Sequence, residues 1–300
     1  MLMVDKPVFI GDGDQALHGS LVIPEGSERR DAVLIWSGSG PTDRNGNCLP
    51  ALNNNGLKML SHELGKAGIV SLRTDKRGVG ESVPAMSNEA DLRLETYVND
   101  AVRWAHFLQD LPNVRKVFLL GHSEGGLITT LAAQKFQASG LVLLAAVGYP
   151  AAEIIRRQLV APGIVIPQGQ LNEIHDIMRS LEAGELVPAV SAQLAAQYRA
   201  SVQPYLMSWF KYDPAAELAK VTGPVLVIQG TNDIQVSLED ADRLAASRMD
   251  IFLVKINGMN HVLKVAPNVR EGNFATYTRP LLPLTPDLLP VITDFLTANS

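Results

Sequence analysis

The stretch Val117-Phe118-Leu119-Leu120-Gly121-His122-Ser123-Glu124-Gly125-Gly126 decides the fold of this chain. Its first four residues are apolar and predict a buried strand, and the segment after it has apolar residues at helical spacing. Between the two, Gly121 to Gly125 fits the pattern G-x-S-x-G, a sharp strand-to-helix turn that exposes its central serine. We therefore predict that Ser123 is a nucleophile, flanked by glycines because side chains there would collide across the turn. A chance serine in a glycine-rich loop is the alternative.

Composition excludes several classes of protein. The chain has 300 residues, 46% of them hydrophobic, which is enough for one large α/β domain. The net charge of -5 gives no sign of a nucleic-acid or membrane partner, and the single Cys48 excludes an intrachain disulfide. We expect no metal and no cofactor. The N-terminal residues lack a leader-like pattern, so we expect a cytoplasmic protein, with a secreted form whose leader has been removed as the alternative.

Strand and helix patterns alternate along most of the chain. The expected strands are 7–12, 16–23, 32–36, 69–72, 117–120, 141–146, 224–228 and 251–254, and the expected helices are 57–66, 94–108 and a last one beginning near Thr285-Pro286. This alternation predicts an α/β fold with a mostly parallel sheet and helices on both faces. The alternation stops at residues 150–213, where only helical patterns occur. We interpret this segment as an inserted helical cap that roofs the site, and residues 1–149 and 214–300 as the core.

A serine nucleophile needs a base and an acid that orients the base. Among six histidines, His261 lies in a loop after the last strand, at the carboxyl edge of the sheet where Ser123 also lies. We predict that His261 is the base, and that the side chain of His122 points away from Ser123. Asp233 follows the 224–228 strand and is the predicted acid. Its rivals Asp240 and Asp242 look like a solvated helix face, and the alternative role for Asp233 is to cap that helix.

The oxyanion of an acyl-transfer reaction needs two preorganised N–H donors. One predicted donor is the backbone N–H of Glu124, at the start of the helix after Ser123. The other lies in the loop Ser37-Gly38-Ser39-Gly40, where glycines let the backbone approach a ligand. We favour the N–H of Ser39, with Gly40 as the alternative and a plain glycine-rich turn as the interpretation without function.

With these residues in place, the chain resembles an α/β-hydrolase, and more narrowly the bacterial esterase-like members near the serine aminopeptidase S33 group. Residues 38–46, residues 75–82 and residues 121–126 carry the resemblance, together with Asp233 and His261. It implies a sheet of about eight strands, a helical cap, and hydrolysis of ester-like acyl bonds without a cofactor. Members of this group commonly have His-Gly where the chain has Ser37-Gly38.

Two charged pairs occur in loops at the same edge of the sheet, Asp43 with Arg44 and Asp75 with Arg77. They could shape the pocket or bind an acidic substrate. We favour ion pairs that hold the loops, because charges near a cleft must be paired when they lose water.

The function expected from these patterns is hydrolysis of a small-molecule carboxylic ester with a small to medium acyl chain. The alternatives are an S33-like aminopeptidase, a thioesterase, an acyltransferase and a non-catalytic ligand-binding protein. An aminopeptidase would need a carboxylate in the cap to hold the substrate amine, and Glu153, Glu173 and Glu182 are available. A homodimer is left open.

Overall fold

The computed structural model describes residues 2–300. Within these residues, one sheet of eight strands has the order β1-β2-β4-β3-β5-β6-β7-β8. The strands are β1 Met3–Ile10, β2 Leu17–Pro24, β3 Arg30–Trp36, β4 Val70–Thr74, β5 Val114–His122, β6 Leu141–Leu144, β7 Val225–Gly230 and β8 Ile251–Ile256. β1 and β2 pair antiparallel, as do β2 and β4, and every other neighbouring pair is parallel.

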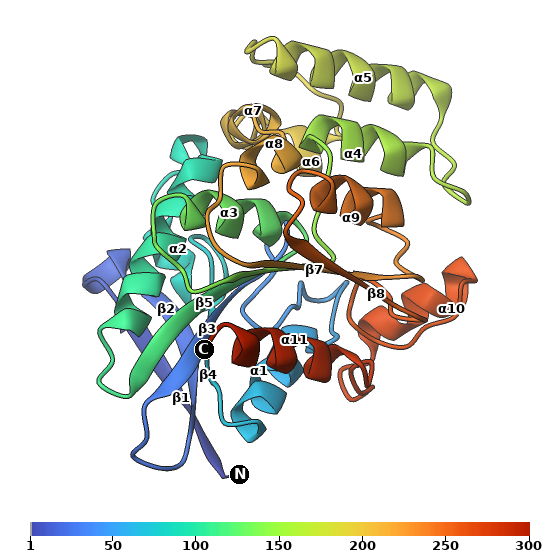
Figure 1. Ribbon diagram of the computed structural model, residues 1–300. Coiled ribbons are helices and arrows are strands. Elements are labelled where there is room, and N and C mark those ends of the chain that lie inside the picture. The colour runs from blue at the N-terminus through green and yellow to red at the C-terminus, as the bar shows by residue number, and fades with distance from the viewer. Residues whose placement is uncertain (1) are drawn as a thin grey trace.

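Helices cover both faces of the sheet (Figure 1). They are α1 Gly56–Lys66, α2 Leu94–Gln109, α3 Glu124–Ala133, α4 Ala151–Leu159, α5 Gln168–Glu182, α6 Ala195–Tyr198, α7 Gln203–Phe210, α8 Pro214–Leu218, α9 Leu238–Ala245, α10 Arg270–Phe274 and α11 Leu288–Ala298. α1 and α11 pack in the core of one face, and α2, α3, α8 and α9 in the core of the other. The predicted fold class is therefore confirmed.

The central strands are apolar throughout because both of their faces are covered. Residues 33 to 36 on β3 and 117 to 120 on β5 are all buried, and β3 pairs with β5 in register so that Trp36 lies beside Gly121. This pairing brings the loop after β3 next to the turn after β5. All the parallel strands end at one edge, so the loops that follow β3, β5, β7 and β8 meet there.

Two local expectations were wrong. The last helix begins at Leu288 rather than near Thr285, because the Thr285 hydroxyl and N–H both bond to the carbonyl of Leu263 instead of capping a helix. Asp240 is buried rather than solvated. Its carboxylate accepts the N–H of Gly148 at 2.8 Å and that of Ser237 at 3.0 Å, which fixes the start of α9.

The segment between β6 and β7 contains α4 to α8, and no strand is found among its described residues. α5 lies outermost, with α4 and α7 between it and the sheet (Figure 1). A separate apolar cluster holds the segment together, with Met178, Leu181 and Ile177 fully buried at its centre. The segment thus has its own small core. No helix among residues 2–300 is long and apolar enough to cross a membrane.

Candidate active site

The turn at Ser123 is strained and tightly packed. Ser123 joins β5 to α3 with φ 57° and ψ -125°, a conformation that residues with a side chain rarely adopt. A Cβ added at Gly121 would lie 2.2 Å from the carbonyl oxygen of Gly125, and one at Gly125 would lie 2.6 Å from the oxygen of Trp36. Only glycine fits at either position, and the turn directs Ser123 into a pocket.

His261 and Asp233 meet at this pocket from two different loops. His261 follows β8, Asp233 follows β7, and the ring Nδ1 lies 2.8 Å from Asp233 Oδ2. Both side chains are buried. The other carboxylate oxygen, Oδ1, accepts the backbone N–H of Gln235 at 2.8 Å and of Val236 at 3.0 Å. Asp233 therefore has both oxygens occupied and does not cap α9, whose N-cap is Ser237.

The surroundings of Asp233 keep it ionised. Burial raises the pKa of this carboxyl, but the neighbouring His261 and the two backbone donors outweigh that effect and hold the pKa below its ordinary value. Gln229, at the end of β7, donates a further hydrogen bond to Oδ2 at 3.0 Å. A buried carboxylate of this kind suits the orientation of an imidazole.

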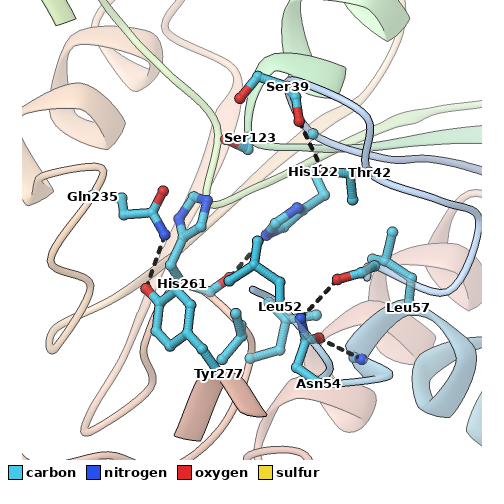
Figure 2. A pocket seen from close by; sticks show the side chains of 15 residues that line it. Ser39, Thr42, Leu52, Asn54, Leu57, His122, Ser123, Gln235, His261 and Tyr277 are labelled. Carbon is cyan, nitrogen blue, oxygen red and sulfur yellow. Dashed lines mark hydrogen bonds between the residues drawn. The ribbon is translucent and has the colours of Figure 1, made fainter. Parts of the chain in front are cut away.

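Ser123 and His261 both line the pocket, as Figure 2 shows, with Ser123 beside the His261 ring. Within the described residues no direct hydrogen bond joins the two side chains. Catalytic hydrogen bonds are often long in ligand-free sites and shorten when the substrate binds, so this arrangement is compatible with a nucleophile and its base.

The side chain of His122 was expected to point away from Ser123, and its ring is directed to the backbone of the His261 loop. Its ring lines the same pocket, lies 4.8 Å from the His261 ring between centroids, and its Nε2 lies 2.8 Å from the His261 carbonyl oxygen (Figure 2). Burial, with the nearby His261, lowers the pKa of His122 to about 3. His122 is therefore neutral, and we assign the proton to Nε2, which donates to the carbonyl and fixes the backbone at His261.

The glycine-rich loop after β3 packs directly on Ser123. A Cβ added at Gly38 would lie 3.0 Å from the Ser123 Cβ, and Gly38 and Ser39 both line the pocket. Gly40 does not belong to that lining. It has φ 66° and open space around it, so its role is in the turn of the loop. The backbone of Glu124 opens α3 on the other side of Ser123.

The four charged loop residues lie outside the pocket lining. Arg44 lies 2.9 Å from Asp75, whose carboxylate also accepts the N–H of Arg44 at 2.8 Å. Arg77 makes two hydrogen bonds to Asp100, at 2.6 and 3.0 Å. Asp43 has no ion pair among residues 2–300 and instead accepts two backbone N–H groups of its own loop. These contacts favour the loop-holding interpretation over binding of an acidic substrate.

The pocket is small, and its remaining lining combines apolar and polar side chains. Its volume is about 80 Å³, and its side-chain lining beyond the residues above consists of Thr42, Leu52, Asn54, Leu57, Gln235, Val262, Leu263 and Tyr277. Every one of these residues belongs to the 38–57 segment or to the segments after β7 and β8. The expectation that the 150–213 segment roofs the pocket was wrong for this cavity, because none of that segment's residues lines it.

The acidic residues of the inserted segment are engaged locally. Glu153 pairs with Arg157, Glu182 with Arg156, and Glu173 accepts the N–H of Ser191 at 2.7 Å. The segment reaches the site instead through α7, where the Tyr205 hydroxyl donates to the buried Glu124 carboxylate. Among the described residues no cluster of histidine, cysteine and carboxylate side chains could hold a metal ion.

Comparisons with known proteins agree with this architecture. Residues 55–265 match the family described as serine aminopeptidase, S33. Esterase EstD of Thermotoga maritima is 27% identical over 250 residues, an alignment that covers 82% of this chain. The chain spans 58% of the length of that curated relative.

Solved structures share the fold at low sequence identity. Est1E of Butyrivibrio proteoclasticus, determined with ferulic acid bound, is 17% identical with a TM-score of 0.64, and the match covers 97% of this chain and 99% of Est1E. The α/β hydrolase GrgF of Penicillium sp. sh18 is 20% identical with a TM-score of 0.62, and the match covers 99% of both chains. At these identities the similarity concerns the fold alone.

Proposed function

The chain belongs to the serine aminopeptidase S33 family of α/β-hydrolases, and from this premise we propose that it is a serine hydrolase that cleaves carboxylic esters of small to medium acyl chain. The observation that carries the proposal is the meeting of three groups at one pocket. The strained Ser123 and the ring of His261 line the pocket, and Asp233 Oδ2 lies 2.8 Å from Nδ1 of that ring, within hydrogen-bond distance.

The proposed reaction has two halves. Ser123 Oγ attacks the ester carbonyl while His261 Nε2 takes the hydroxyl proton, and the oxyanion is stabilised by the N–H groups of Ser39 and Glu124. His261 then gives the proton to the leaving alcohol, so that an acyl group remains on Ser123. Water, deprotonated by His261, attacks this acyl-enzyme, and His261 returns the proton to Ser123 Oγ as the acid is released. Asp233 keeps the Nδ1 proton in place throughout, so that Nε2 is free to accept.

The pocket favours an ester over a peptide with a free N-terminus. An aminopeptidase needs a carboxylate to pair with the substrate amine, and the described lining of the pocket contains neither aspartate nor glutamate. A volume of about 80 Å³ is also well below the ~300–1,000 Å³ of pockets for drug-sized ligands. Small acyl groups such as acetyl and butyryl suit this space, and the relative named Esterase EstD agrees with ester chemistry.

The test compares p-nitrophenyl esters of increasing acyl length with proline p-nitroanilide. We expect turnover of the acetate and butyrate, decline with longer chains, and no release from the anilide. Ser123→Ala should lower kcat on the order of 10⁴-fold while leaving the melting temperature unchanged. A fluorophosphonate probe should label the wild type at Ser123 and leave Ser123→Ala unlabelled. Labelling elsewhere, or anilide hydrolysis without ester hydrolysis, would contradict the proposal.

A further inference from the structure

A buried lysine lies behind the glycine-rich loop. Lys76 follows β4, and only 1% of its surface is exposed. Its ammonium donates to the carbonyl oxygens of Gly38 and Gly40, the second at 2.8 Å, and it lies 5.7 Å from the centre of the Tyr97 ring. Burying an ammonium is costly unless its donors are satisfied, so a lysine here needs a specific reason.

The geometry of the peptide bond links Lys76 to the oxyanion. The Gly38 carbonyl and the Ser39 N–H belong to one planar trans peptide, in which the two groups point in opposite directions. When Lys76 holds the carbonyl, the Ser39 N–H is turned away from Lys76. The Gly40 carbonyl belongs to the peptide of Pro41, which has no N–H, so that bond anchors the loop without adding a donor.

Ser123 packs against Gly38, the residue that carries this carbonyl. The close approach of Gly38 to the Ser123 Cβ leaves the loop little freedom to rotate. The positively charged ammonium that donates to this carbonyl also polarises the peptide, and the polarisation makes the Ser39 N–H a stronger donor. Gly38 thus packs against the proposed nucleophile and accepts a hydrogen bond from a buried cation.

The positive charge of Lys76 is balanced by the carboxylate of Glu124, the residue that follows Ser123. Glu124 is 1% exposed, and its charge acts on Lys76 through space. Burial lowers the pKa of Lys76 and raises that of Glu124, and each charge opposes the effect on the other. One oxygen of Glu124 accepts from Tyr205 on α7, and the other is buried without a partner among the described residues.

We propose that Lys76 is a positioning residue for ester hydrolysis: by holding the carbonyls of Gly38 and Gly40, its ammonium aims and polarises the Ser39 N–H toward the oxyanion. The inference rests on the proposed function, because it concerns the same reaction at Ser123. It assigns to Lys76 an effect on the transition state rather than on the binding of the ester. The loss of Lys76 should therefore change kcat and leave KM nearly constant.

The experiment removes the ammonium and keeps the volume, with Lys76→Met. For p-nitrophenyl acetate we expect kcat to fall about 10- to 100-fold, near the effect of losing or displacing one oxyanion donor, with little change in KM. The same variant is also assayed on the matching thionoester, because a general loss of stability would lower both rates and leave their ratio unchanged. Sulfur accepts hydrogen bonds poorly, so the preference of the wild type for the oxygen ester over the thionoester should shrink in Lys76→Met.

Lys264→Met is the matched control. Lys264 is also fully buried and also donates to a backbone carbonyl, that of Leu282, but it does not contact the glycine-rich loop. We expect this variant to lose stability while keeping the wild-type preference for the oxygen ester. An equal loss of that preference in both lysine variants would overturn the assignment.

A second variant covers the case in which Lys76→Met does not fold. Removing one of two buried charges leaves the other uncompensated, so Lys76→Met/Glu124→Gln should be more stable than Lys76→Met. Its kcat and its oxygen-ester preference should stay low, because the carbonyls still lack their donor. A folded double variant with wild-type kcat and preference would refute the role of Lys76. A wild type that neither hydrolyses esters nor reacts with the fluorophosphonate would instead refute the proposed function itself.

Discussion

Replacing Asp233 by asparagine tests the proposed triad most directly, because the structure dictates how the new amide must lie. The oxygen at the Oδ1 position receives two backbone N–H groups, from Gln235 at 2.8 Å and from Val236 at 3.0 Å. An amide NH₂ at that position would face two donors. The asparagine therefore keeps its oxygen there and turns its NH₂ toward His261 Nδ1, where the wild type has an acceptor at 2.8 Å. Gln229, which donates to Oδ2 in the wild type, can turn its amide so that its oxygen accepts from this NH₂.

This orientation reverses the hydrogen bond on the imidazole. Nδ1 must now accept, so the single proton of the neutral ring moves to Nε2, the nitrogen that faces Ser123. A ring protonated there cannot take the proton of the serine hydroxyl. We expect kcat to fall on the order of 10⁴-fold, which corresponds to about 5.5 kcal/mol of lost transition-state stabilisation. The fold should persist because the amide has the same shape as the carboxylate.

The assay measures kcat for p-nitrophenyl acetate from pH 6 to 9 together with thermal unfolding. Asp240→Asn is the matched control, since Asp240 is also a buried aspartate that accepts backbone N–H groups but does not contact His261. It should lower the melting temperature and leave kcat close to that of the wild type. The reasoning is refuted if folded Asp233→Asn keeps more than about a tenth of the wild-type kcat, or if Asp240→Asn loses as much activity.

Three further predictions concern the glycine-rich loop and His122. In Gly38→Ala the new Cβ would lie 3.0 Å from the Ser123 Cβ, closer than the ~3.5–4.0 Å that carbon atoms prefer. The loop must therefore shift by about 0.5–1 Å, and we expect kcat to fall about 10- to 100-fold at constant KM. Gly40→Ala meets no atom within 4 Å but has φ 66°, so it should cost about 1–2 kcal/mol of stability in chemical denaturation instead. The pKa of His122 is about 3 when folded and 6.5 ordinarily, so between these values the unfolded chain binds a proton that the folded chain does not. The unfolding free energy should therefore drop by about 1.4 kcal/mol per pH unit as the pH falls below 6, and His122→Asn should show a shallower slope.

Local sequence patterns were sufficient for the elements that carry the site. The strand at 117–120 and the spacing of Gly121 and Gly125 depend on short-range packing, which the sequence displays directly. Asp233 and His261 could be selected because strands of a parallel sheet end at one edge, so residues that follow different strands lie together there. The two strands expected at residues 7–12 and 16–23 also formed, and they pair antiparallel as β1 and β2.

The errors concern contacts between segments far apart in the chain. Asp240 was assigned to a solvated face because its neighbours are charged. It is buried instead, and its carboxylate accepts the N–H of Gly148, 92 residues away. Likewise, no pattern in the sequence indicated that the ring of His122 bonds to the carbonyl of His261, 139 residues away. The position of the 150–213 segment relative to the pocket depends on how its own apolar core packs. The helical periodicity of the sequence does not indicate that packing. Lys76 was not singled out, because a lysine between charged residues reads as part of the surface.

We infer that buried charges connect the inserted segment to a pocket that it does not line. Glu124 supplies a backbone N–H beside Ser123, and its side chain ends in the bond to Tyr205 on α7. Its charge also opposes the cost of burying Lys76, whose ammonium holds the glycine-rich loop. A displacement of α7 would therefore remove a hydrogen bond from Glu124, weaken its compensation of Lys76, and reach the oxyanion donors through groups that never touch the substrate. By this inference, the segment acts on the proposed reaction through an electrostatic connection rather than as a roof over the pocket.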